Sequence, residues 1–287
     1  MPRDVSELLG LLDLETIDDN LFRGGQLPSA LPRVFGGQVA AQALVGAART
    51  MGEGYDVHSL HSYFLQPGDT GAPIVYDVEA LRDGRSFATR RVLARQHGRP
   101  IFVMTADFQR PEEGFEHQDV APDDVPPPEE CLDPKSLASS EGFSEWDAID
   151  MRYVGSSADL LAEDPTRPGR QRFWLRVSGE LPDDPLLHTI AFAYASDMTL
   201  MGAALAAHGQ RLGSPETMIA SLDHSVWFHH GFRADQWWLY DQHSPATSGG
   251  RGLVNARVFT QDGRLVASVA QEALLRRMRA ESGGDPS

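Results

Sequence analysis

The stretch that decides the fold runs from Arg33 to Leu44 and reads Arg-Val-Phe-Gly-Gly-Gln-Val-Ala-Ala-Gln-Ala-Leu. Its glycine pair, Gly36-Gly37, leads into an alanine-rich run that continues through Ala48. Alanine is the strongest helix former, and its small side chain lets a helix pack closely against a sheet. We therefore predict a buried central helix that begins near Gly36.

Segments with strand character follow this helix and are separated by short turns rich in glycine and proline. The predicted strands cover residues 58–65, 74–80, 86–95 and 101–108. Alternating or β-branched runs between such turns are typical of antiparallel strands. The first half is thus predicted to be a helix followed by an antiparallel meander, with an amphipathic helix over residues 5–18 in front of it.

The second half repeats this order of elements. It has a strand at 172–177, a helical region at 183–207, and strands at 218–229, 237–243, 252–260 and 265–275. Between the halves, the stretch from Pro111 to Glu141 is dense in proline and acidic residues and has little periodicity, as surface connections do. The predicted domains are residues 1–112 and 151–287, joined by a connector over 113–150.

Three pairs of segments resemble one another in the same order in both halves. They are SLHSYF (59–64) with LDHSVWF (222–228), IVYDVEA (74–80) with WLYDQHS (238–244), and HGRPIFVMTADF (97–108) with DGRLVASVAQEA (262–273). Aligning the His-Ser pairs sets His58 opposite Ser221, and aligning the Gly-Arg turns sets Ala106 opposite Gln271. Such ordered similarity indicates an internal repeat.

Composition narrows the possible partners. The chain has 287 residues, 41% of them hydrophobic, and a net charge of −16, which argues against electrostatic binding of nucleic acid. A local run of arginines (Arg82, Arg85, Arg90, Arg91, Arg95, Arg99) fits either a phosphate site or a solvated strand face. The apolar stretch 189–207 is interrupted by Ser196, Asp197 and Thr199, so we expect no stable membrane insertion. The single Cys131 rules out an intramolecular disulfide.

Long motifs in both halves carry a family resemblance. They are FRGGQ, RVFGGQVAAQAL, VHSLHSYFLQPGD, PIVYDVEALRDGRSFATRRV, GRPIFVMTADFQ, YASDMTLM, SLDHSVWFHH and DGRLVASVAQEALLR. Together, from Leu21 to Arg276, they resemble the acyl-CoA thioesterase II family, the TesB-like proteins. The resemblance implies an α+β fold of two fused hot-dog domains, each an antiparallel sheet wrapped around a central helix, with the two sheets joined side by side.

The resemblance also implies an activity and its residues. It implies hydrolysis of fatty acyl-CoA, which we expect to be of medium to long chain, to free acid and CoA without metal or organic cofactor. A water would be organised by Asp197, Ser221 and Gln271, with Ser221 standing where many relatives have threonine. Because the repeat gives the first half no such trio, we expect one hydrolytic centre, in the second half. The N–H groups at Gly36 and Gly37 are predicted to polarise the thioester carbonyl, unless these glycines serve only close packing.

The residue types suit this chemistry. A thioester needs a positioned water, a base for its proton and donors for the carbonyl oxygen. Asp197 lies in an otherwise apolar helix, where an unpaired carboxylate would be costly. Strand alternation puts Ser221 on one face with Asp223 and Ser225, and His224 on the other. Taken alone, Ser221 and Gln271 also have ordinary structural explanations, as an edge-strand serine and an outward polar residue.

Other chemistries fit less well. The histidines near Asp223 lack a zinc spacing, and there is no G-x-S-x-G motif of a serine hydrolase. A hydratase on the same fold would pair Asp with His, and no histidine lies where the helix carries Asp197. A non-catalytic acyl-CoA carrier would not need the trio. The acidic start of the chain and its Gly-Asp-Pro-Ser end lead us to expect a cytoplasmic protein, and the edges of the sheet lead us to expect a homo-oligomer.

Overall fold

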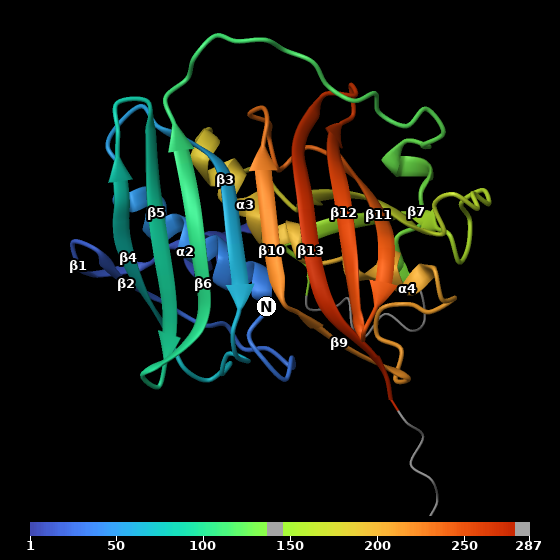
Figure 1. Cartoon of the computed structure of the whole chain (residues 1–287), viewed down its shortest axis with the longest axis horizontal. Coiled ribbons are helices and arrows are strands. Elements are labelled where there is room, and N and C mark those ends of the chain that lie inside the picture. The colour runs from blue at the N-terminus through green and yellow to red at the C-terminus, as the bar shows by residue number, and fades with distance from the viewer. Residues whose placement is uncertain (137–145, 279–287) are drawn as a thin grey trace, which may run out of the picture.

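The computed structural model describes residues 1–136 and 146–278 as a large antiparallel sheet with its helices packed on one face (Figure 1). The predicted central helix is α2 (Gly36–Arg49), and residues 37–47 of it are all buried. Its alanines let the helix lie against the sheet, as expected. The other helices are α1 (Val5–Leu12), α3 (Pro185–Ser196) and α4 (Met201–Ala206), with short 3₁₀ turns η1 (Pro128–Glu130) and η2 (Pro134–Ser136).

The described residues form one 13-stranded sheet to which the two halves contribute separate blocks. The first half supplies β1 (Glu15–Asp18), β2 (Leu21–Gly24), β3 (Asp56–Phe64), β4 (Ile74–Asp83), β5 (Phe87–Gln96) and β6 (Arg99–Gln109). The second supplies β7 (Ile149–Ser156), β8 (Gly169–Val177), β9 (Thr217–Ser221), β10 (Asp223–Phe228), β11 (Trp238–Ser248), β12 (Arg251–Thr260) and β13 (Leu265–Arg277). The strand order is β1-β2-β4-β5-β6-β3-β10-β13-β12-β11-β8-β7, and β9 pairs with β13.

The two blocks meet where β3 pairs with β10, at the middle of the sheet (Figure 1). Ser62 lies opposite His224 there, and the Ser62 hydroxyl donates to the His224 carbonyl at 2.8 Å. On the helical side, α2 also contacts α3. The expected double hot-dog fold is therefore confirmed: the sheet is continuous across the junction between the halves, and α2 of the first half contacts α3 of the second.

Some predicted elements are divided in the structure. The N-terminal helix ends at Leu12, and its expected second part is strand β1. The predicted strand 218–229 is broken at Leu222 into β9 and β10, and the helical region 183–207 is broken into α3 and α4. The His-Ser alignment is also out of step by one residue, because His61 is exposed whereas His224 is buried.

The interrupted apolar region has the length and composition of a membrane span, which differs from our expectation. Residues Pro185–Ala206 have a mean hydropathy of 1.2 over their most apolar window, and 83% of that window is buried inside the fold. Among the residues described, this is the one helical segment that is long and apolar enough to cross a membrane. Its burial is typical of a core helix in a globular domain, and such helices can be equally long and apolar.

The acidic connector lies against the face of the second half that the helices leave uncovered. Trp174 of β8 donates through its indole N–H to the Pro126 carbonyl at 2.9 Å. Ala121, Val125 and Cys131 pack against an apolar cluster of Trp174, Leu239 and Phe259. The described part of the connector is therefore attached to the second half.

Candidate active site

Asp197 lies at a break between two helices, and buried polar groups hold that break open. Tyr240 donates its hydroxyl proton to the Ser196 carbonyl at 2.8 Å, which satisfies an acceptor at the end of α3. The Gln171 amide donates to the Thr199 carbonyl at 2.9 Å, and the Gln242 amide donates to the Thr199 hydroxyl at 2.6 Å. These partners from β8 and β11 stabilise a turn at Asp197. Asp197 is therefore the residue that follows the end of α3, and not part of one long apolar helix as the sequence predicted.

The glycine pair at the start of α2 allows the two central helices to touch at this point. A Cβ on Gly36 would lie 2.5 Å from Asp197 Oδ2, and a Cβ on Gly37 would lie 2.2 Å from the Tyr194 carbonyl oxygen. Neither position has space for a side chain. Close packing is therefore one role of both glycines: Gly37 approaches α3, and Gly36 approaches both Asp197 and Phe64 of β3.

The three residues predicted to hold a water lie together in the structure. Gln271 donates from its amide nitrogen to Asp197 Oδ1 and to Ser221 Oγ, both at 2.7 Å. The Ser221 hydroxyl lies 3.4 Å from the same Asp197 oxygen and donates to it. Their joint position follows from the sheet, because Ser221 on β9 pairs with Ala273 on β13, two residues from Gln271. The catalytic role of the trio remains a prediction.

Burial raises the pKa of Asp197 above the usual aspartate range. The positive charge that His224 carries when protonated, and hydrogen bonds from Gln271, from the Gly37 backbone N–H and from Ser221, act in the opposite direction without cancelling the shift. Gly37 lies in the first turn of α2, where N–H groups lack partners within the helix and favour a negative charge. A carboxylate with a raised pKa is a better proton acceptor, which suits a general base.

His224 is a polar residue of this region that the sequence analysis placed on the wrong face. It is fully buried, with its Nδ1 3.1 Å from Gln271 Oε1 and its Nε2 2.8 Å from Ser196 Oγ. The strand break at Leu222 changes the alternation, so Ser221 and His224 both point toward Gln271. The Asp-His-Ser motif can be recognised in the sequence, but the strand break before it cannot be predicted from the sequence.

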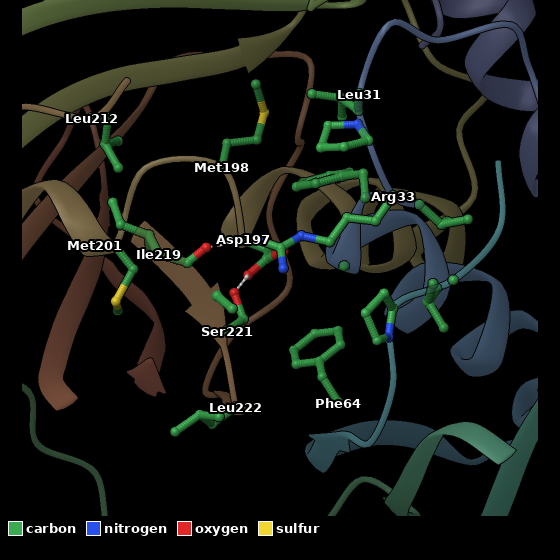
Figure 2. A pocket seen from close by; sticks show the side chains of 18 of the residues that line it. Leu31, Arg33, Phe64, Asp197, Met198, Met201, Leu212, Ile219, Ser221 and Leu222 are labelled. Atoms are coloured by element: carbon green, nitrogen blue, oxygen red, sulfur yellow. Dashed lines mark hydrogen bonds between the residues drawn. The ribbon is translucent and has the colours of Figure 1, made fainter. Parts of the chain in front are cut away.

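A cavity of about 690 Å³ opens beside Asp197 and Ser221 at the junction of the two halves. Figure 2 shows Asp197 bonded to Ser221, with Arg33 and Phe64 from the first half facing them. The lining that follows residue 145 is mostly apolar, with Trp146, Met151, Met198, Met201, Leu212, Ile219, Ala220 and Leu222. The cavity thus combines one polar cluster with an apolar interior, as ligand sites commonly do.

Comparisons with known proteins agree over nearly the whole chain. A family model described as "Acyl-CoA thioesterase N-terminal domain" matches residues 26–109, and one described as "Acyl-CoA thioesterase" matches residues 163–274. Human acyl-coenzyme A thioesterase 8 is 39% identical over 295 residues, which cover 96% of this chain and 91% of that protein. The chain belongs to the acyl-CoA thioesterase II family.

Further relatives are bacterial. Acyl-CoA thioesterase 2 of Haemophilus influenzae is 38% identical to this thioesterase, with 95% of this chain and 98% of that protein covered. The crystal structure of acyl-CoA thioesterase II TesB2 from Mycobacterium marinum is similar at a TM-score of 0.81 and 45% identity, covering 94% of this chain and 98% of that one. The predicted family is confirmed, and with it a thioester hydrolase.

The arginine run of this thioesterase does not form one phosphate site. Arg90 is buried and bonds to Asp83 and to Thr50, and Arg91 pairs with Glu79. Arg99 lines a separate small hollow. The cation that does line the main cavity is Arg33, whose guanidinium donates to the Ile219 carbonyl at 2.6 Å. Arg33 stands three residues before Gly36, and its place in the glycine motif was the available signal.

Proposed function

We propose that this protein hydrolyses fatty acyl-CoA of medium to long chain to free fatty acid and CoA. The observation that carries the proposal is the Gln271 amide, which links Asp197 and Ser221 at the wall of an apolar cavity. Family membership supports the reaction class, and the cavity's apolar lining supports an acyl chain as its occupant. A cytoplasmic location and self-association remain predictions.

In the proposed reaction, Ser221 and Gln271 orient a water beside the thioester. The water oxygen attacks the carbonyl carbon while Asp197 takes its proton, and collapse of the tetrahedral intermediate breaks the carbon–sulfur bond. Asp197 then returns the proton to the departing CoA sulfur. The start of α2 at Gly36, which lines the cavity, is proposed to stabilise the carbonyl oxygen. The Gly37 N–H has a different role in this proposal, because it donates to Asp197.

A hydratase is less well supported, because its chemistry would require a histidine in contact with the substrate. His224 has no exposed surface, and both of its ring nitrogens are hydrogen-bonded. A carrier is less well supported too, since binding alone does not require a carboxylate that accepts from Gln271, Ser221 and the Gly37 N–H.

The test is spectrophotometric thiol release from acetyl-, octanoyl- and palmitoyl-CoA, with hydration of an enoyl-CoA measured in parallel. We expect turnover with octanoyl- and palmitoyl-CoA and much less with acetyl-CoA, because a short chain leaves the apolar cavity unfilled. Hydration without thiol release would support the hydratase. Binding of palmitoyl-CoA without either reaction would support the carrier.

A further inference from the structure

We propose that His224 is a positioning residue that fixes the orientation of the Gln271 amide, and thereby keeps a donor rather than an acceptor facing Asp197 and Ser221. The proposal rests on the proposed function, because Gln271 is assigned there to the water site. His224 itself lies outside the cavity lining and acts only through Gln271.

The argument begins with the two ends of the Gln271 side chain. A carboxylate can only accept hydrogen bonds, so the amide must present its NH₂ group to Asp197. Both amide protons are then used, one on Asp197 and one on Ser221. The Gln271 carbonyl oxygen consequently points the other way, to His224 Nδ1 at 3.1 Å.

An oxygen in that position requires a donor, so the geometry assigns the Nδ1–H form to His224. The opposite ring nitrogen, Nε2, lies 2.8 Å from Ser196 Oγ. The single Ser196 proton can go to Nε2 or to the Ala193 carbonyl at 3.0 Å, and in the Nδ1–H form of His224 it goes to Nε2. Burial lowers the pKa of His224, although the Asp197 charge opposes this, so the ring stays neutral near pH 7 and carries one proton. The Gln271 oxygen, which can only accept, selects Nδ1 as the nitrogen that holds that proton.

Loss of the Nδ1 donor would leave two acceptors facing each other in a buried place. That contact would weaken the preference for the present amide orientation. In the orientation rotated by half a turn, the Gln271 oxygen would face the Asp197 carboxylate and Ser221 would lose its donor. In that orientation the trio could not hold a water. Ser196, His224, Gln271 and Asp197 therefore form one series of hydrogen bonds. In this series the donor of each bond determines which atom is left to accept or donate in the next.

The decisive experiment compares two isosteric substitutions. In H224N the side-chain amide occupies the place of Nδ1 and can donate to Gln271, whereas in H224Q it occupies the place of Nε2 and can only reach Ser196. We expect H224N to keep kcat for palmitoyl-CoA within about tenfold and H224Q to lose roughly a hundredfold or more, as when general-base catalysis is disabled. KM should change little in both, since His224 does not line the cavity.

Controls separate this proposal from a purely structural role. His229, which follows β10, is exposed, bonds to Ser268 and does not line the cavity, so H229Q should leave kcat unchanged. Equal losses in H224N and H224Q would overturn the positioning role. Full activity in H224Q, in an enzyme that D197N inactivates, would also overturn it while leaving the proposed function intact. A wild-type protein without thiol release would instead refute the proposed function.

A measurement on the unaltered protein avoids any question of folding. Nitrogen NMR of ¹⁵N-histidine-labelled enzyme distinguishes the two neutral forms of the ring, and disappearance of one resonance set in H224N assigns the signal. We expect the Nδ1–H form at pH 7. Observation of the Nε2–H form would overturn the proposal whatever the kinetics show.

Discussion

At the scale of single residues, the structure makes Asp197 the group on which turnover should depend most. Replacing it in D197N keeps the shape and removes the base, and we expect kcat to fall by at least roughly a hundredfold. Asparagine also presents an NH₂ group to surroundings that consist of donors, namely Gln271, Ser221 and the Gly37 N–H. Thiol release measures the loss, and thermal unfolding of the variant verifies that it is folded.

The raised pKa of Asp197 gives this prediction a pH dependence. The base must be deprotonated, so kcat/KM should be highest above its pKa and decline as the pH falls through it. Because burial moves that pKa upward, the decline should begin at a higher pH than an ordinary aspartate would give. A rate profile that stays flat down to the ordinary aspartate range would contradict the assignment of Asp197 as the base.

At the scale of elements, the contact between α2 and α3 holds the site together. G37A would place a methyl group 2.2 Å from the Tyr194 carbonyl, so the helices must separate. We expect a loss of about 1–3 kcal/mol in the free energy of unfolding. Turnover should fall as well, because Asp197 moves with α3 while Ser221 and Gln271 stay with the sheet. Urea unfolding and thiol release test the two effects.

A matched control comes from a helical glycine without such a neighbour. No atom lies within 4 Å of a Cβ placed on Gly10 of α1. G10A should therefore raise the free energy of unfolding, by about 0.5–1 kcal/mol, because alanine loses less backbone entropy in a helix. Turnover should be unaffected. A G37A variant that behaves like G10A would show that the two helices do not need their close contact.

The sequence predicted the helices and strands that depend on local residue patterns. It did not predict features that depend on contacts with residues distant in the chain. Helix α2 and strands β3 to β6 follow from alanine content, alternation and glycine turns. The break at Leu222 does not, because the Leu222 N–H donates to Glu272 while its carbonyl accepts from Phe64. Leu222 thus joins strands of both halves, and no local signal encodes that. The trio itself came from the family resemblance, whereas His224 required the strand break to be known.

At the scale of the whole molecule, the repeat has become asymmetric. Ala106 is buried on the inner face of β6 beside Leu60, while on β13 the inner residue is Gln271 beside His224. The first half therefore contributes an apolar wall where the second contributes polar groups. Each half is nevertheless incomplete, because Gly36 and Arg33 of the first line the same cavity as Asp197 of the second.

The connector is held on the outer face of the second half's strands by ion pairs with a partly buried group of charges. Asp241 of β11 accepts from Arg172 at 2.8 Å and from Arg257 at 2.7 Å, and its side chain has no exposed surface. The same arginines reach Asp124 and Asp119 of the connector. Asp241 thus positions the cations to which the connector binds. We expect D241N to leave Arg172 buried with less compensation and to lower the free energy of unfolding by about 3 kcal/mol.

The pH dependence identifies this charge as the cause. Burial alone would raise the pKa of Asp241, but hydrogen bonds and charges from Arg172 and Arg257 outweigh it and leave the pKa below the usual range. The stabilisation is therefore complete above about pH 3.9, where unfolded aspartate titrates, and is lost as the pH falls through the lower folded pKa. Urea unfolding should show a constant difference in the free energy of unfolding between wild type and D241N near neutral pH, and this difference should close only below about pH 3.9.

The half-exposed pair of Asp150 with Arg176 is the control, since D150N should cost at most about 1 kcal/mol. Faster proteolysis within residues 113–136 of D241N, and not of D150N, would show that the connector has been released, and equal stability of the two variants would refute the role of Asp241.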